Sequence, residues 1–444
     1  MPNAPALPLD SSGPPSFERP RVLIVGGGAG GLELAVALAR QGRVQVVLVD
    51  AERSHVWKPH LHEVAAGQLN PEKESVEYMA LASRFGFKFV RGWVEGLDRE
   101  NKRALVKAET RTGYDSPAQS IPYGHCVLAV GSSANDFGTP GVLQHAMRLD
   151  DLGSAQAFHA KLLNLAEMKE RVGDSDPMRI AIVGGGATGV ELAAELAEAS
   201  KKLAFYGHEQ IKKTPIEISI LNAAPALLPG LPDRVASAAQ SILEGRGVAI
   251  KNNAKVKAVL DGSIDYEDAD GPKSAPCDIA VWAAGVKAPE WLKSLGLDAN
   301  RINQLLVSPA MATSDPCVSA MGDCCSAAWA AKPGQTVPPR AQAAHQMADY
   351  LADTLADRID GRAVPPFAYK DYGSLVSLGS HATAGTLMGA LAEKSLFVEG
   401  KLAKFMYLAL YHGHQFKIHG PVSAMGLFMG KSLQKRFDPK IKLH

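Results

Sequence analysis

Residues 21–41 read RVLIVGGGAGGLELAVALARQ, and this stretch decides the fold. Residues 22–25 are all apolar, which is typical of a strand buried on both faces of a parallel sheet. Gly26, Gly28 and Gly31 follow at once in the pattern G-x-G-x-x-G, and apolar residues then recur at helical spacing. A second apolar run comes after the predicted helix. The segment therefore predicts a strand–helix–strand unit of the Rossmann type.

The chemistry that this unit predicts is the binding of a dinucleotide. Its glycines permit a tight turn, let a pyrophosphate approach the backbone, and let helix and strand pack closely. The N-terminus of the helix offers unpaired N–H groups and the positive end of its dipole to the phosphates. Asp50 ends the second apolar run, about 20 residues on, where a carboxylate can accept hydrogen bonds from ribose hydroxyls.

A second unit of the same kind begins near residue 180. An apolar run leads into Gly184, Gly186 and Gly189, and a helical pattern follows them. The next apolar run ends at Asn222, where an acid is expected. Asn222 can bond a ribose hydroxyl but lacks the negative charge that repels a 2′-phosphate, so NADH and NADPH both remain open. The two units predict an internal duplication of a nucleotide-binding fold.

Further glycines mark where each unit closes. Gly131 and Gly285 each follow an apolar strand, where a tight crossover lets the backbone approach a dinucleotide. The chain then returns to the first unit, since an apolar stretch leads into Met321-Gly322-Asp323. Two dinucleotide sites favour a flavin paired with a nicotinamide, because hydride passes directly between their rings. At a strand-to-helix turn, Asp323 can then bond a ribityl hydroxyl of FAD.

Composition excludes several classes of protein. The 444 residues have a formal net charge of +1 and only 6% aromatic residues, so nothing points to a nucleic-acid partner. Five cysteines without a C-x-x-C pair give neither a disulfide framework nor a zinc motif, so reduced thiols and no metal site are expected. The start lacks the pattern of a signal peptide, and no run of about 20 apolar residues predicts a membrane span.

The C-terminal tail has a charge of its own. From Lys401 onward there are eight Lys or Arg against one acid (+7), which leaves 39 bases against 45 acids (−6) in the rest of the chain. Apolar residues alternate with these bases in two predicted helices, broken near Gly420-Pro421. Basic amphipathic helices lie in the membrane interface and are attracted to anionic lipid. A helix packed on the protein's own core or on a second copy is the alternative.

Taken together, these motifs resemble the type II NADH:quinone oxidoreductase family, and the tail most resembles its proteobacterial branch. The segments that carry the resemblance, which runs from about Arg21 to the end, are Gly26–Gly31, Trp57–Pro59, Leu61–Ala65, Gly184–Glu195, Trp282–Pro289, Ala320–Cys324, Pro339–Met347 and Glu399–Gly420. The resemblance implies FAD in the first unit and NADH as the substrate of the second. It also implies reduction of a membrane quinone such as ubiquinone in respiratory electron transport, without proton pumping.

The resemblance implies peripheral attachment to the cytoplasmic face of the inner membrane, and it is compatible with a homodimer. The fold class expected is therefore α/β, with two Rossmann-like dinucleotide-binding domains and a C-terminal amphipathic membrane-anchoring region. The expected divisions are a disordered lead-in (1–20), the first part of the FAD-binding domain (21–150), the NAD(P)H-binding domain (151–288), the return of the FAD-binding domain with a quinone-site helix (289–396), and a basic amphipathic membrane-binding tail (397–444).

The same resemblance implies roles for individual residues. Glu191, in the first turn of the second unit's helix, is placed near the nicotinamide and the quinone. Gln342 and Gln346 lie four residues apart and so share one helix face, where their amides could bond quinone carbonyls. Lys58 is expected to line the flavin. Without the family, an acid in a first turn simply complements the helix dipole, and two such glutamines are typical of a solvated face.

Two other functions fit parts of the pattern. Cys324-Cys325 invites comparison with sulfide:quinone oxidoreductases, whose chemistry needs redox cysteines that face the flavin. Cys126 and Cys317 are further candidates, but both lie in apolar runs typical of buried, inert thiols. The other alternative is a flavoprotein whose tail docks a protein partner. The type of quinone and the oligomeric state remain open.

Overall fold

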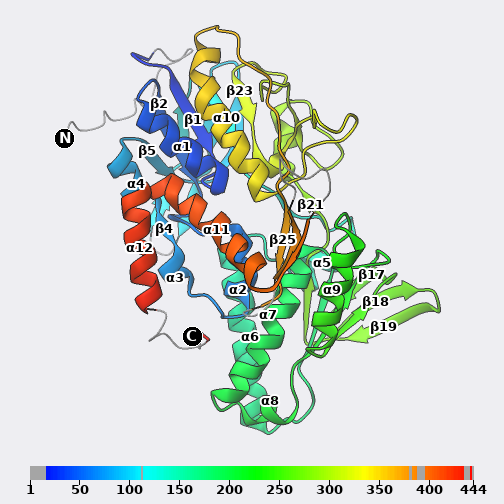
Figure 1. Ribbon diagram of the computed structural model, residues 1–444. Helices are drawn as coiled ribbons and strands as arrows, with labels where there is room; N and C mark the ends of the chain where they lie inside the picture. The colour runs from blue at the N-terminus through cyan, green and yellow to red at the C-terminus, as the bar shows by residue number, and fades with distance from the viewer. Residues whose placement is uncertain (1–16, 112–113, 380–382, 388–395, 435–440, 443–444) are drawn as a thin grey trace.

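The computed structural model describes residues 17–111, 114–379, 383–387, 396–434 and 441–442. Most of the predicted lead-in, residues 1–16, lies outside these ranges. Figure 1 shows two α/β halves, one above the other, with the C-terminal helices between and beside them. The predicted α/β fold with two parallel sheets is confirmed.

The first sheet has five parallel strands in the order β23-β11-β1-β2-β5. Its register aligns Val25 at the end of β1 with Val49 and Leu128 on the two neighbouring strands. The bounds are β1 (Arg21–Val25), α1 (Ala29–Gln41), β2 (Gln45–Asp50), β5 (Lys88–Arg91), β11 (His125–Leu128) and β23 (Val318–Ala320). Because β23 comes from residues after the second unit, the chain does return to complete the first sheet.

The second sheet repeats the order of the first, β13-β20-β14-β15-β16, and is again wholly parallel. Its elements are β13 (Ala146–Met147), β14 (Arg179–Val183), α7 (Ala187–Phe205), β15 (Glu217–Leu221), β16 (Val248–Lys251) and β20 (Ile279–Trp282). Each half also carries a three-stranded antiparallel sheet. In the first half it lies between β5 and β11 and consists of β6 (Val94–Asp98), β7 (Arg103–Val106) and β10 (Gln119–Pro122). In the second half it lies between β16 and β20 and consists of β17 (Lys255–Leu260), β18 (Ser263–Asp268) and β19 (Gly271–Pro276). The duplication predicted from the glycine patterns thus extends to these insertions.

Long helices cover the sheets and connect the halves. These are α6 (Leu152–Val172), α9 (Asp233–Glu244), α10 (Ala341–Ile359), α11 (Gly400–His419) and α12 (Pro421–Gln434). Between α10 and α11 the chain forms a three-stranded sheet of β25 (Gly373–Ser377), β26 (Thr383–Leu387) and β27 (Leu396–Glu399). Shorter elements include β3 (Ser54–His55), α2 (Leu61–Ala65), α3 (Pro71–Glu74), β4 (Val76–Glu77), α4 (Tyr78–Phe85), β8 (Glu109–Arg111), β9 (Tyr114–Ser116), β12 (Ser133–Ala134), α5 (Val142–His145), α8 (Glu209–Lys213), β21 (Val286–Lys287), β22 (Leu305–Leu306) and β24 (Cys325–Ser326).

Helix α10 packs directly on α1, because Gly30 lets the two backbones approach. A Cβ added at Gly30 would lie 3.0 Å from the carbonyl oxygen of Ala344 on α10 and 2.7 Å from the methyl carbon of Met321. The helix that the sequence analysis predicted around Gln342 and Gln346 is found as α10.

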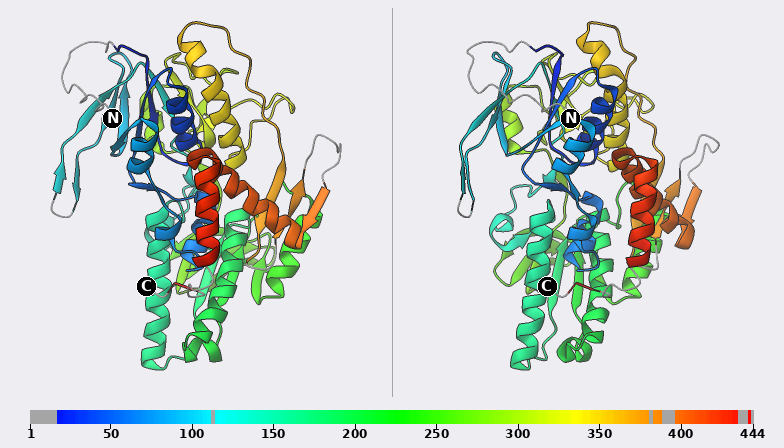
Figure 2. Two further views of the ribbon diagram at one scale, coloured as in Figure 1. Left: turned by 60° about the vertical axis from the view of Figure 1, so that its left-hand side comes forward. Right: turned by 90° about the vertical axis from the view of Figure 1, so that its left-hand side faces the viewer.

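The tail forms two helices that break where the sequence predicted, at Gly420, whose φ of +77° suits glycine. They differ in their surroundings. On α11 the side chains of Tyr411, His414 and Ile418 are buried, so this helix packs on the protein's own core. On α12 large apolar side chains are exposed, and both views of Figure 2 place it on the outer surface. Within the described ranges, none of the helices combines the length and the apolar composition needed to cross a bilayer.

Candidate functional site

The first glycine loop is built from two crowded glycines and one open glycine. A Cβ at Gly26 would lie 2.5 Å from the oxygen of Ala129, and one at Gly31 would lie 2.0 Å from the oxygen of Gly26. Beside Gly28 nothing lies within 4 Å of the added atom. The crowded pair therefore permits the fold, while Gly28 leaves space at the N-terminus of α1, where a pyrophosphate is expected.

The second loop repeats this division of roles. A Cβ at Gly184 would lie 2.7 Å from the oxygen of Ala283, and one at Gly189 would lie 2.1 Å from the oxygen of Gly184. Gly186 again faces open space. Glu191, which the sequence analysis placed in the first turn of α7, lies just beyond that turn. Neither α1 nor α7 has a side-chain cap at its N-terminus or an acidic residue in its first turn. Both ends therefore keep N–H donors for a diphosphate, so the two loops fit FAD and a nicotinamide dinucleotide.

Asp50 and Asn222 lie at equivalent strand ends but make different contacts. Asp50 accepts hydrogen bonds from the backbone N–H of Gly27 (2.6 Å) and of Glu52 (2.8 Å), and burial raises the pKa of its carboxyl. The Asn222 amide nitrogen points into its own turn, 2.9 Å from the oxygen of Ala226 and 2.8 Å from Oδ1 of Asn252. Asp50 thus shapes the glycine loop above it, while the amide of Asn222 is engaged within the protein.

Three segments distant in sequence meet beside the first loop. Lys58 donates from Nζ to the backbone oxygen of Ser132 (2.6 Å), and the Ser132 hydroxyl donates to Oδ2 of Asp323 (2.8 Å). The side chain of Gln304 holds the backbone oxygen of Asp323 at 3.0 Å. The structure therefore brings together Lys58 and Asp323, which the sequence singled out separately. Ser132 was missed, although it directly follows the closing Gly131.

The glutamines of α10 form hydrogen bonds with the loop that leads into β25. The Gln346 amide donates to the backbone oxygen of Lys370 (2.8 Å) and accepts from its N–H (2.9 Å). Gln342 donates to the backbone oxygen of Gly373 (2.8 Å) and accepts from the N–H of Tyr372 (3.2 Å). Both side chains lie on one helix face, as their spacing predicted, but they are bonded to this loop. The two side chains are half-buried, and their amides bond the protein backbone.

Glu191 is buried at the other end of β25. Its Oε1 accepts a hydrogen bond from the N–H of Ser377 (2.9 Å), and its Oε2 lies 3.4 Å from Nδ1 of the buried His62. Burial raises the pKa of Glu191 to about 8, and the backbone hydrogen bond only partly opposes this effect. Glu195, one turn further along α7, also has its pKa raised by burial to about 8.

β25 therefore joins the three residues for which the sequence suggested catalytic roles. Gly373 at its start is held by Gln342, and Ser377 at its end is held by Glu191. Extended chain rises about 3.3 Å per residue, so these two contacts are roughly 13 Å apart along one strand. No motif marked residues 370–377, and only the folded chain shows that they link α10 to α7.

Gly285 lies where the chain crosses between the halves. Its φ of +63° is in the left-handed region, and a Cβ there would lie 2.5 Å from the ring of Phe137. The indole N–H of Trp282 donates to the backbone oxygen of Asn135 (2.7 Å), which fixes this crossing. Strands β12 and β21 pair here, so the closing glycines of the two units lie beside one linking sheet.

The cysteines do not support a sulfide-oxidising site. All five are free thiols, and all but Cys317 are buried. Burial raises the pKa of Cys324 to about 11 and that of Cys325 well above its ordinary value, which disfavours the reactive thiolate. The Cys324 thiol donates to the backbone oxygens of Leu128 and Met321, as a structural thiol does.

Known proteins match this chain over most of its length. Residues 20–348 match the family model for pyridine nucleotide-disulphide oxidoreductases. A type II NADH:quinone oxidoreductase from Haemophilus influenzae is 37% identical over 448 aligned positions, which cover 95% of this chain and 99% of that protein. The solved structure of NDH2 from Plasmodium falciparum in complex with NADH gives a TM-score of 0.79 at 18% identity, covering 96% of this chain and 100% of that one. The sulfide:quinone oxidoreductase of Aquifex aeolicus gives a TM-score of 0.70 at 19% identity, covering 91% and 92%, and shares the fold.

Proposed function

The chain belongs to the type II NADH:quinone oxidoreductases, within the pyridine nucleotide-disulphide oxidoreductase family, and we propose from this premise how its own residues serve electron transfer from NADH through FAD to a quinone. The first glycine loop, with Gly26, Gly28 and Gly31, holds FAD together with the Lys58–Ser132–Asp323 cluster. The second loop, with Gly184, Gly186 and Gly189, holds NADH, and Asn222 and Gly285 border it. When bound, FAD accepts hydride from NADH and passes two electrons to the quinone.

The single observation that carries the quinone site is the linkage through β25. Gln342 and Gln346 hold the loop of residues 370–373 against α10, and Glu191 holds the far end of the strand. We place the quinone beside this strand, between α10 and α7. The glutamines then act as positioning residues, because their amides already bond the loop backbone.

Glu191 has the properties of a proton donor at this site. Quinone reduction consumes protons as well as electrons, and a donor must be protonated near neutral pH to supply one. With its pKa raised to about 8, the Glu191 carboxyl is neutral at pH 7. His62 lies 3.4 Å away, and burial lowers the pKa of its imidazole to about 3, so it is a neutral neighbour of the carboxyl group.

Separate half-reactions test this assignment as a whole. We expect anaerobic NADH to bleach the flavin absorbance of the purified protein, and a water-soluble quinone to restore it. Stopped-flow spectroscopy gives a rate for each step. Bleaching by sulfide but not by NADH would contradict the assignment and favour the sulfide-oxidising alternative.

The first site prediction concerns the loop contact. Gln346→Leu removes both bonds to Lys370, so the loop loses its register on α10. We expect reoxidation by quinone to slow by about tenfold, which corresponds to the loss of one to two net hydrogen bonds, while reduction by NADH stays nearly unchanged. Asp353→Ala, an exposed change on the same helix, is the matched control. An unchanged reoxidation rate in Gln346→Leu would remove the loop contact from the quinone step.

The second site prediction concerns pH. A carboxyl with its pKa raised to about 8 is protonated below that pH and loses its proton as the pH rises through 8. We therefore expect the quinone-driven step to be fast below pH 8 and to fall above it. Glu191→Gln keeps a neutral side chain but cannot donate a proton, so the step should slow by about 10²-fold and lose this pH dependence.

Because Glu195 has a similar pKa, the assignment needs both variants. In the described part of the chain, the hydrogen bond to Ser377 and the ion-pair contact with His62 are made by Glu191 and not by Glu195. Glu195→Gln should therefore retain the decline above pH 8. If the decline disappears in Glu195→Gln and persists in Glu191→Gln, the proton donor is Glu195.

For localisation, we propose peripheral attachment to the cytoplasmic face of the inner membrane through α12. Val422, Met425 and Met429 follow helical spacing along one side of this helix and are 85%, 51% and 60% exposed. Ala424 and Lys431 lie on the opposite side, where Lys431 pairs with Glu74 of α3 (2.6 Å). The apolar side fits a lipid interface, and the basic tail favours anionic lipid. Lys435, Arg436 and Lys440 lie outside the described residues.

A further inference from the structure

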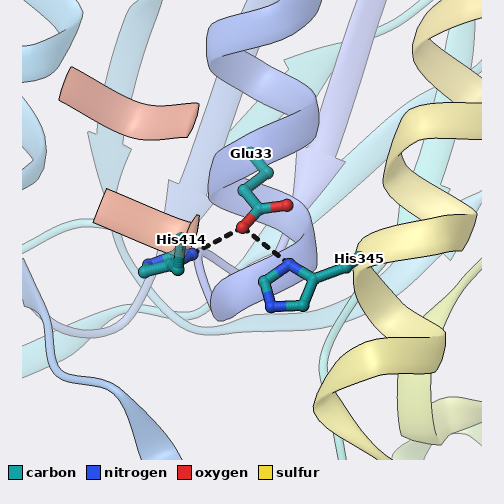
Figure 3. A group of neighbouring side chains, drawn as sticks. All are labelled: Glu33, His345 and His414. Carbon is teal, nitrogen blue, oxygen red and sulfur yellow. Dashed lines mark hydrogen bonds and ion pairs between the residues drawn. The ribbon is translucent and has the colours of Figure 1, made fainter. Parts of the chain in front are cut away.

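Three side chains from three helices converge on one point beneath the first glycine loop. Glu33 comes from α1, His345 from α10 and His414 from α11, as Figure 3 shows. The Nδ1 atoms of the two histidines lie 2.7 Å and 2.6 Å from the same carboxylate oxygen, Oε1 of Glu33. These three ligand atoms lie within 4.8 Å of one another.

The burial of this cluster favours a bound cation. Glu33 and His414 are fully buried, and a buried carboxylate is costly unless it is paired. Nε2 of His414 lies 3.1 Å from Nε2 of His55, whose ring also bonds the backbone of Gly27. If neutral His55 donates to the Gly27 carbonyl, its Nε2 can only accept, so His414 must donate from Nε2.

That arrangement turns the lone pair of His414 Nδ1 toward the Glu33 carboxylate. Two lone-pair atoms 2.6 Å apart repel unless a proton or a metal ion lies between them. Nδ1 of His345 is buried and close to the same oxygen, but it is not aligned as a hydrogen-bond donor. With this tautomer of His414, and with the proton of His345 on Nε2, the three atoms present lone pairs to one common point.

We propose that Glu33, His345 and His414 form a binding site for a divalent transition-metal ion of the zinc type. Two imidazoles and one carboxylate are a ligand set that zinc uses, and the set leaves a fourth position open. His55 would orient His414 from its far side, as hydrogen-bonded neighbours of metal-bound histidines do. Hard cations such as Mg²⁺ prefer oxygen ligands and should be excluded.

Small movements would be needed to accept the ion. Ligands at 2.0–2.1 Å from tetrahedral zinc lie about 3.3 Å apart, so the present separations must open by about 0.6 Å. His345 can move away from Glu33, because it lies at the edge of the cluster with 15% of its side chain exposed. The 2.6 Å contact between His414 and Glu33 must also open, and a rotation of the Glu33 carboxyl group would open it.

One neighbour opposes the ion. Nζ of Lys417 lies 3.4 Å from the other carboxylate oxygen of Glu33, and Asp349 binds it at 2.7 Å. The ammonium repels a divalent ion, while Asp349 offsets part of that charge. The lysine therefore sets the affinity without supplying a ligand, and its removal should strengthen binding.

Bound metal would fasten α11 to the two helices that carry the FAD loop and the quinone-site glutamines. It would also change the environment of Trp57. The ring centroid of Trp57 lies 5.4 Å from that of His345, on which it stacks, and 4.5 Å from that of His414. Trp57 thus reports on this site independently of the electron-transfer reaction.

The test uses full-length, FAD-loaded protein without a polyhistidine tag. Titration calorimetry should show one Zn²⁺ per chain and no heat with Mg²⁺. Co²⁺ should give the absorption bands of a nitrogen- and oxygen-ligated ion and should quench tryptophan fluorescence. All of these readouts are independent of activity.

Variants identify the ligands. His345→Ala and Glu33→Gln should each weaken Zn²⁺ binding by at least about tenfold. Lys417→Gln should strengthen binding severalfold, an effect in the opposite direction that damage to the fold would not produce. His145→Ala, at an exposed histidine on α5, should bind like the unchanged chain.

Two results would overturn the proposal. The first is the absence of stoichiometric Zn²⁺ binding to the unchanged, FAD-loaded chain. The second is binding that survives in His345→Ala with equal affinity, which would place the ion elsewhere. If Glu33→Gln fails to fold, His345→Ala and Lys417→Gln still decide the question, since both residues are partly exposed.

Discussion

Gly28→Val is expected to give a folded protein that has lost FAD and all NADH:quinone activity. Gly28 has φ −58° and ψ −179°, which valine adopts without left-handed strain, and nothing in the described chain lies within 4 Å of an added Cβ. The new side chain therefore fills the space at the N-terminus of α1 without disturbing the protein itself. That space is where the diphosphate must meet the backbone N–H groups.

Two other glycines of the loops, the open Gly186 and the crowded Gly31, provide controls with different outcomes. Gly186→Val makes the equivalent change in the second loop, so it should keep FAD and lose reduction by NADH. Gly31→Ala should fail to fold, because its Cβ would lie 2.0 Å from the backbone oxygen of Gly26. Flavin absorbance per chain measures FAD occupancy, and circular dichroism checks the fold. Full FAD occupancy in Gly28→Val would show that the first loop does not bind the cofactor.

The success of the sequence analysis at these loops has a local cause. Each loop is specified by neighbouring residues: an apolar strand, three spaced glycines and a helix that begins at once. A side chain at Gly31 would collide with Gly26 in the same loop, and one at Gly26 would collide with Ala129 after the adjoining strand. Because these contacts belong to the local strand–loop–helix geometry, the spacing of the glycines is enough to predict the loop. The same holds for Asp50, which bonds the N–H of Gly27 in its own unit.

The quinone side was predicted less completely, because its contacts join distant segments. The pairing of Gln342 with Gln346 could be read from their spacing, but their partners in residues 370–373 could not. Likewise, no spacing rule connects Glu191 with Ser377, which lies 186 residues further on. Folding places these groups together through the packing of whole helices and strands.

The tail shows a different limit. Both α11 and α12 have apolar residues at helical spacing together with lysines, and this pattern does not identify what covers the apolar side. On α11 the protein itself covers it, through buried Ile418 and the His414–Glu33 contact. On α12 the apolar side remains exposed. The two helices should therefore respond differently to removal.

A chain that ends at Gly400 is expected to lose its fold and its FAD. It would lack Lys417, and the buried carboxylate of Glu33 would lose its ammonium partner, a change that costs about 3–5 kcal/mol when a buried charge is left unpaired. It would also lose buried Tyr411 and Ile418 from the interface of α11. Together these losses approach the total stability of a typical domain, about 5–15 kcal/mol. Yield of soluble protein, flavin content and melting temperature measure the outcome.

A triple variant, Val422→Gln, Met425→Gln and Met429→Gln, changes the exposed side of α12 and keeps the rest of the tail. These side chains are 51–85% exposed, so the fold, FAD content and activity with a soluble quinone should be retained. Flotation with anionic liposomes and activity with membrane-embedded quinone should both fall, because the apolar contribution to membrane binding is removed.

The two changes together separate anchoring from folding. High salt should release the intact protein from anionic liposomes only in part. Salt screens the attraction between the basic residues and the anionic lipid, since the Debye length is already about 10 Å at 0.1 M, but it leaves the apolar contacts in place. If the triple variant floats as well as the intact chain, the membrane contact lies outside α12. If it instead changes from dimer to monomer while membrane binding persists, a second copy of the chain covers this face. A soluble, FAD-loaded chain ending at Gly400 would mean that α11 contributes far less to the fold than its buried side chains indicate.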